Sequence, residues 1–83
     1  MLSPGAILRS LTGELATVVS VDACAELLIP QPSGGELLWT WPRRSTERAL
    51  RTLGYQHVGV EDVDVLAERV RLARAEARNR RAA

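Results

Sequence analysis

The sequence is marked first by the residue types that it lacks. It contains no lysine and no phenylalanine, a single cysteine, a single histidine and only three aromatic residues, Trp39, Trp41 and Tyr55. One cysteine, Cys24, excludes a disulfide or a cysteine-based metal cluster within one chain, as is usual in a reducing compartment. Without phenylalanine, the core must be built mainly from aliphatic side chains, which contribute about 1.5–3 kcal/mol each when large and fully buried.

Long apolar runs are also missing. No stretch approaches the ~20 apolar residues that a membrane-spanning helix needs, and no basic segment precedes an apolar one at the start of the chain. We therefore expect a soluble, cytoplasmic protein with no membrane partner. A chain of 83 residues predicts one domain, residues 1–83. Such a small domain buries only about 60% of its unfolded surface, so stabilisation by a second copy or another partner is a reasonable expectation.

The sequence contains no recognisable catalytic motif. The only histidine, His57, stands outside any Ser-His-Asp or Glu-x-x-His pattern. It could act as a general base or a pH switch, but a structural role in a connecting segment is favoured. The run Ser33-Gly34-Gly35 lacks the remainder of a phosphate-binding loop and is typical of a turn. We expect no enzymatic activity, no metal and no cofactor.

Charge is sorted along the chain. Residues 1–42 hold one arginine and four acidic residues, a net charge of −3, whereas residues 43–83 hold ten arginines and six acidic residues, a net charge of +4. The use of arginine in place of lysine could reflect the phosphate-matching geometry of guanidinium, but abundant alanine, arginine and valine and the absence of phenylalanine favour GC-rich codon usage as the explanation. Codon usage does not sort charges along a chain, so the asymmetry is a hint about a partner.

The acidic part of the chain is rich in β-forming residues. Short runs of such residues occupy positions 6–9, 15–21, 26–29 and 36–41, and glycine, proline or aspartate separates them. Residues 55–60 form a connector or a fifth strand. Consecutive strands with tight turns predict an antiparallel β-meander or a small SH3-like barrel over residues 6–42.

The basic part begins after Pro42 and is predicted to be helical. Ser45 or Thr46 can cap a short helix over residues 47–53, with Gly54 just after its end. A longer helix over about residues 62–80 contains no glycine or proline. The fold class is therefore α+β.

The longer helix has an identifiable start and one apolar stripe. Glu61 or Asp62 can cap it, and residues 79–83 are expected to form a frayed tail. Side chains on the stripe recur every three or four residues. We assign this stripe as the surface through which the helix pairs with a copy of itself or with another chain: Val63, Leu66, Val70 and Ala73.

Trp39 and Trp41 form the first candidate binding feature. On a strand, both indoles project from the same face, together with Leu37. On an exposed face they would form a stacking platform or a peptide clamp. The alternative places them in the core, and this interpretation is favoured for Trp39, whereas the two readings are balanced for Trp41.

A cluster of arginines forms the second candidate feature: Arg43, Arg44, Arg48 and Arg51. Arg44, Arg48 and Arg51 fall on one stripe of the short helix, where they could hold phosphates beside Trp41. A solvated helix face is the alternative, and it is slightly favoured.

Two functional hypotheses follow. The first is a non-catalytic protein–protein interaction or adaptor module that self-associates or binds another protein through its long helix. The alternative is a nucleic-acid-binding small barrel that uses the Arg43–Arg51 patch and the tryptophan pair. A helix-turn-helix over residues 45–80 is disfavoured, because residues 54–60 make too long a turn.

Overall fold

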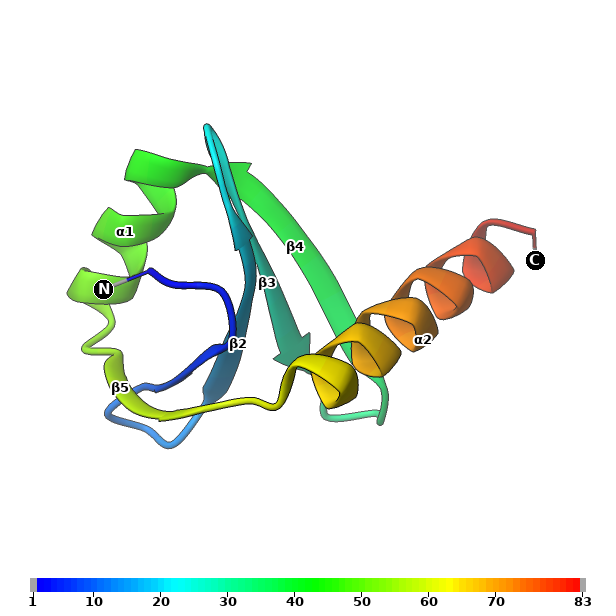
Figure 1. The fold of residues 1–83 in the computed structure, drawn as a ribbon, viewed down its shortest axis with the longest axis horizontal. Coiled ribbons are helices and arrows are strands. Elements are labelled where there is room, and N and C mark those ends of the chain that lie inside the picture. The colour runs from blue at the N-terminus through cyan, green and yellow to red at the C-terminus, as the bar shows by residue number, and fades with distance from the viewer. Residues whose placement is uncertain (1, 83) are drawn as a thin grey trace.

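The chain forms an open antiparallel sheet with one helix packed on each face. A computed structural model describes residues 2–82 (Figure 1). The elements in chain order are β1 (Ala6–Arg9), β2 (Leu15–Val21), β3 (Cys24–Pro30), β4 (Glu36–Pro42), α1 (Arg43–Thr52), β5 (Gln56–Val60) and α2 (Val63–Ala82). The α+β class is confirmed. Neither of the helices in this part of the chain is long and apolar enough to cross a bilayer.

The five strands pair in the order β4-β3-β2-β1-β5, which confirms the antiparallel meander. Residues 55–60 contribute the fifth strand, because β5 pairs with β1. Within residues 2–82 the sheet does not close into a barrel: β4 and β5 are its two edges. Helix α1 connects these edges, and Leu50 of α1 packs on the face that a closed barrel would enclose.

The sheet separates two small hydrophobic clusters. Successive residues of a strand point to opposite faces, so Leu27 packs toward α1 and Leu28 packs toward α2. The cluster on the α1 side contains Ala6, Leu8, Ala16, Val18, Leu27, Leu50 and Tyr55. The cluster on the α2 side contains Leu28, Leu66, Val70 and Ala73. Neither cluster is large, as expected for a chain without phenylalanine.

Helix α1 begins at Arg43, earlier than the sequence predicted. The expected cap at Ser45 or Thr46 is wrong: Thr46 is buried inside the helix, and its hydroxyl donates a hydrogen bond to the Pro42 carbonyl over 3.0 Å. The backbone N–H of Arg43 donates to the carbonyl of Ala23 at 3.0 Å. Strand β4 therefore continues directly into α1, and a carbonyl of the turn between β2 and β3 satisfies the first N–H of the helix.

The end of α1 is as predicted. Gly54 follows the helix with a positive φ of 74°, a backbone conformation that glycine adopts without steric cost. Its N–H donates to the carbonyl of Arg51 at 3.1 Å, and the N–H of Tyr55 donates to the carbonyl of Leu50 at 2.9 Å. These two bonds form a Schellman motif, and the buried side chains of Tyr55 and Leu50 supply its usual apolar contact.

Asp62 caps α2, which confirms one of the two predicted caps. Its carboxylate accepts hydrogen bonds from the N–H groups of Asp64 at 2.9 Å and Val65 at 3.2 Å. The backbone is helical as far as Ala82. The frayed tail predicted for residues 79–83 stays a prediction, since Ala83 lies outside the described residues.

The apolar stripe of α2 is already used within the chain. Leu66, Val70 and Ala73 are buried against the sheet beside Leu28, and only Val63 is well exposed, at 80%. Helix α2 covers the face of the sheet that carries Leu28. The sequence pattern did not reveal this, because an apolar stripe looks the same whether it packs within the chain or against a partner. Three of the four side chains assigned to a partner interface are therefore unavailable in this fold.

Arg69 anchors α2 to the sheet. Its guanidinium donates to the carboxylate of Glu36 on β4 at 2.8 Å and to that of Glu61 at 2.9 Å. A longer bond of 3.3 Å reaches the hydroxyl of Thr17 on β2. The hydrogen bonds that Arg69 donates to Glu36, followed by the attraction of both carboxylates, raise the pKa of Arg69 above its ordinary value, against the opposing effect of burial.

We expect Arg69→Met to lower the free energy of unfolding by about 1–2 kcal/mol, measured by urea denaturation. Removing one partner of a fully buried pair costs about 3–5 kcal/mol. The cost is smaller here because the three side chains remain 21–23% exposed. Arg71→Met is the matched control, because Arg71 pairs with Glu68 on the exposed side of the same helix. Equal effects of the two substitutions would contradict the anchoring role of Arg69.

Candidate functional site

The two tryptophans lie on the edge strand β4 and are half exposed. Trp39 is 40% exposed and Trp41 is 45% exposed, so the core interpretation that was favoured for Trp39 is wrong. Their ring centroids lie 5.5 Å apart, with an edge-to-face angle of 81°. Trp39 stands opposite Leu27 of β3, and hence on the α1 side of the sheet. Among residues 2–82 no strand lies beyond β4 to cover the outer side of the indoles.

A hollow of about 350 Å³ lies beneath the tryptophans, between β4 and α1; we call it the aromatic groove. Trp39, Trp41 and Leu53 form its walls, and Leu53 of the α1 C-cap is 59% exposed. Leu27 and Tyr55 are among the apolar side chains at its base. The groove can take an apolar side chain from outside.

Helix α1 carries a basic rim next to this groove. Arg48 lines a shallow hollow of about 480 Å³ together with Trp41, so the structure brings these two predicted residues together. Arg44, Arg48 and Arg51 are exposed, and no ion pair joins them to a carboxylate in the described part of the chain. Arg43 differs, since it pairs with Glu47 at 3.0 Å. The basic rim therefore consists of Arg44, Arg48 and Arg51.

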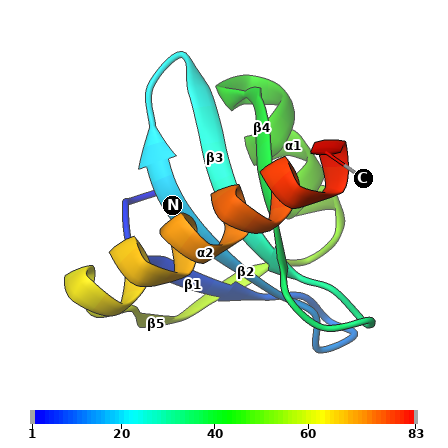
Figure 2. The same ribbon diagram turned by 90° about the vertical axis from the view of Figure 1, so that its right-hand side faces the viewer.

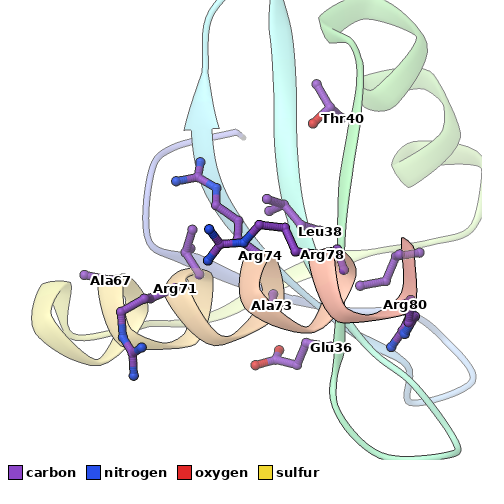
Figure 3. Close-up of a pocket in the computed structure, with 12 residues that line it drawn as sticks. Glu36, Leu38, Thr40, Ala67, Arg71, Ala73, Arg74, Arg78 and Arg80 are labelled. Atoms are coloured by element: carbon purple, nitrogen blue, oxygen red, sulfur yellow. The ribbon is translucent and has the colours of Figure 1, made fainter. Parts of the chain in front are cut away.

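A second basic surface lies on the other side of β4 and was not predicted. A hollow of about 620 Å³ between β4 and α2, the basic groove, is lined by Leu37, Leu38 and Thr40 of the strand and by four arginines of the helix: Arg71, Arg74, Arg78 and Arg80. In Figure 3, Arg74 and Arg78 extend to one side of α2, whereas Arg71 and Arg80 extend to the other. The arginines were visible in the sequence, but how α2 crosses the sheet was not.

Reactive side chains do not gather elsewhere. Cys24 is exposed at the start of β3, and His57 is exposed on β5. Among residues 2–82 no three His, Cys, Asp or Glu side chains lie close enough together to hold a metal ion. The features that remain are the aromatic groove, the basic rim and the basic groove.

Comparison of the chain with known protein families, with curated proteins and with solved structures found no significant match. The function of the chain must therefore be inferred from the chemistry of the aromatic groove, the basic rim and the basic groove. That chemistry consists of exposed indoles, an apolar hollow and guanidinium groups on both sides of one edge strand.

Tyr55, the only tyrosine, reports on the base of the aromatic groove. Burial, followed by the nearby carboxylate of Glu14, raises the pKa of its phenol above the ordinary 10.0. A phenol with a higher pKa in the folded chain adds stability that is complete below about pH 10 and is lost as the pH rises through the folded-state pKa.

We therefore expect the free energy of unfolding to fall above about pH 10 in the native chain, and to fall less in Tyr55→Phe. Urea denaturation on both sides of this pH measures the difference. Phenolate absorbance of the folded chain should show titration above the pKa found in urea. A folded-state pKa at or below the value in urea would contradict the burial of Tyr55.

Proposed function

We propose that this chain is a non-catalytic protein-interaction module, and that its partner docks an apolar side chain in the aromatic groove. The observation that carries the proposal is the pair of half-exposed tryptophans beside an apolar hollow. Tryptophan is among the residues that contribute most to binding at protein interfaces, and arginine is another. Arg48 lies directly beside Trp41.

The proposal keeps the predicted class of function but moves the binding surface. Leu66, Val70 and Ala73 of α2 are buried against the sheet, so they support intramolecular packing rather than an interface. The exposed apolar side chains of β4 and of the end of α1 differ from those of α2 in that they border one apolar hollow. A small domain with so thin a core would also be stabilised by a partner that covers this area.

Nucleic acid is the alternative, and the geometry of the tryptophans favours it less. Bases bind single-strand platforms by stacking in succession on exposed ring faces. Two indoles at 81° to each other cannot both lie parallel to one stack of bases. The basic rim of Arg44, Arg48 and Arg51 would suit phosphates, but the formal net charge of the chain is only +1.

A tryptophan-free probe tests the proposal, because both tryptophans of the chain lie at the aromatic groove. The probe is the alternating peptide acetyl-Glu-Ile-Glu-Phe-Glu-Ile-Glu-amide, which presents apolar and acidic side chains on opposite faces when extended. We expect it to shift the tryptophan emission of the chain saturably. Trp41→Ala should weaken binding about tenfold or more while Trp39 still reports.

Leu72→Ala is the matched control, since Leu72 is an exposed apolar residue on α2, away from the aromatic groove. Circular dichroism verifies that both variants fold. An emission response to a deoxythymidine oligonucleotide that weakens steeply with salt, with none to the peptide, would favour nucleic acid. No response to either ligand would overturn the proposal.

A further inference from the structure

The backbone of β4 has unpaired hydrogen-bonding groups along its outer edge. The N–H of Arg43 bonds to the carbonyl of Ala23, and the N–H of Gln31 bonds to the carbonyl of Gly35, at the two ends of the β3–β4 ladder. Hydrogen bonds alternate along an antiparallel pair. Residues 37, 39 and 41 therefore direct their backbone groups toward β3, and residues 36, 38 and 40 direct theirs outward.

The N–H groups of Leu38 and Thr40 are thus available on this edge. No hydrogen bond from another described residue engages them. Pro42 is the next outward position and has no N–H to offer, which sets one end of the usable edge. A free donor at every second residue is the template that a further strand needs.

This edge also lacks the features that normally prevent strand pairing. Proteins protect exposed edges with bulges, inward charges, or very short strands. Strand β4 is 7 residues long, and its register with β3 shows no shift over residues 24–42. Residues 37–41 carry no charge. The opposite edge strand, β5, is shorter and its register with β1 is shifted by a bulge or irregularity.

The two helices flank the outer edge of β4. In Figure 2, α1 and the last turns of α2 both extend past β4, on opposite sides of the sheet. Leu37 and Leu38 face opposite sides of the sheet, yet both line the basic groove, so this hollow includes the outer edge of the strand. An added strand would lie about 4.8 Å from β4, between the helices.

The charges on both flanks select the occupant. On the α1 side, Arg44, Arg48 and Arg51 have no carboxylate partner in the described part of the chain. On the α2 side, Arg78 lines the basic groove and has no carboxylate partner within residues 2–82, whereas Arg80 pairs with Glu76 at 3.4 Å. A second copy paired through β4 would add its own unpaired arginines to the same edge, which is electrostatically unfavourable. An acidic segment would instead be attracted from both sides.

We propose that β4 accepts an extended acidic segment of another protein as an additional strand of the sheet. Its side chains alternate between the two faces. Apolar side chains on one face enter the aromatic groove beside Trp39 and Trp41, and acidic side chains on the other face meet Arg78 in the basic groove. This inference rests on the proposed function, and adds to it the backbone pairing and the alternating pattern of the partner.

Amide hydrogen exchange measured by NMR tests the pairing directly. In the free chain the amides of Leu38 and Thr40 should exchange fast, whereas that of Trp39 is already protected by β3. Saturation with the alternating peptide should slow exchange at Leu38 and Thr40 about tenfold or more, because each N–H gains a hydrogen bond. The Trp39 amide provides the internal reference.

N-methylated peptides give a second measurement. Alternate residues of an added strand direct their backbone groups to the same edge, so methylation of the three apolar residues and methylation of the glutamates block opposite edges. The peptide whose methyl groups lie on the edge that faces β4 should bind about tenfold or more weaker than the unmodified peptide, and the other methylated peptide only slightly weaker. Arg78→Gln should also weaken binding, and Arg9→Gln is the charge-matched control outside both grooves.

The outcomes separate this inference from the proposed function. If the peptide binds in a Trp41-dependent manner but leaves the Leu38 and Thr40 amides unprotected, the partner docks by side chains alone and strand addition is wrong. Equal effects of the two methylated peptides would lead to the same conclusion. If sedimentation shows that the free chain is a dimer, and hydrogen exchange shows that its Leu38 and Thr40 amides are already protected, a second copy is the occupant and the acidic segment is excluded.

Discussion

Arg69 joins three parts of the chain that lie far apart in sequence, and the placement of α2 depends on it. Within residues 2–82, the buried apolar cluster between α2 and the sheet takes three side chains from the helix, Leu66, Val70 and Ala73, and one of them is an alanine that buries little area. The guanidinium adds hydrogen bonds to Glu36, Glu61 and Thr17. Because Glu36 begins β4, the same contact positions the edge strand relative to α2. The basic groove depends on this placement, since its walls come from these two elements.

The charge asymmetry of the sequence is largely resolved inside the fold. Acidic residues of the sheet meet arginines of α2: Glu36 pairs with Arg69, and Glu26 approaches Arg74 at 3.8 Å. These two contacts join the acidic first half of the chain to the basic second half. Beside β4, the arginines without a carboxylate partner in the described chain are those of the basic rim on α1 and Arg78 of α2.

The features that could be predicted from the sequence are those set by local chemistry. Gly54 ends α1 because glycine adopts positive φ without strain, and Asp62 starts α2 because its carboxylate accepts N–H groups two and three residues ahead. The start of α1 depends on the carbonyl of Ala23, which is distant in sequence. The exposure of Trp39 depends on where the sheet ends. A residue pattern carries no information on that, because it would be the same for an edge strand and a central one.

The open sheet links the modest core to the proposed function. If β4 paired with β5, the barrel would be closed, the outward amides of Leu38 and Thr40 would be satisfied, and the tryptophans would have neighbours on both sides. The open sheet lacks those contacts, and the two apolar clusters in the described chain contain few large side chains. A partner strand would restore them: it would satisfy the amides, cover the indoles and neutralise the arginines of both flanks. Binding and folding stability are then coupled through a single edge, because whatever binds only the folded chain also stabilises it.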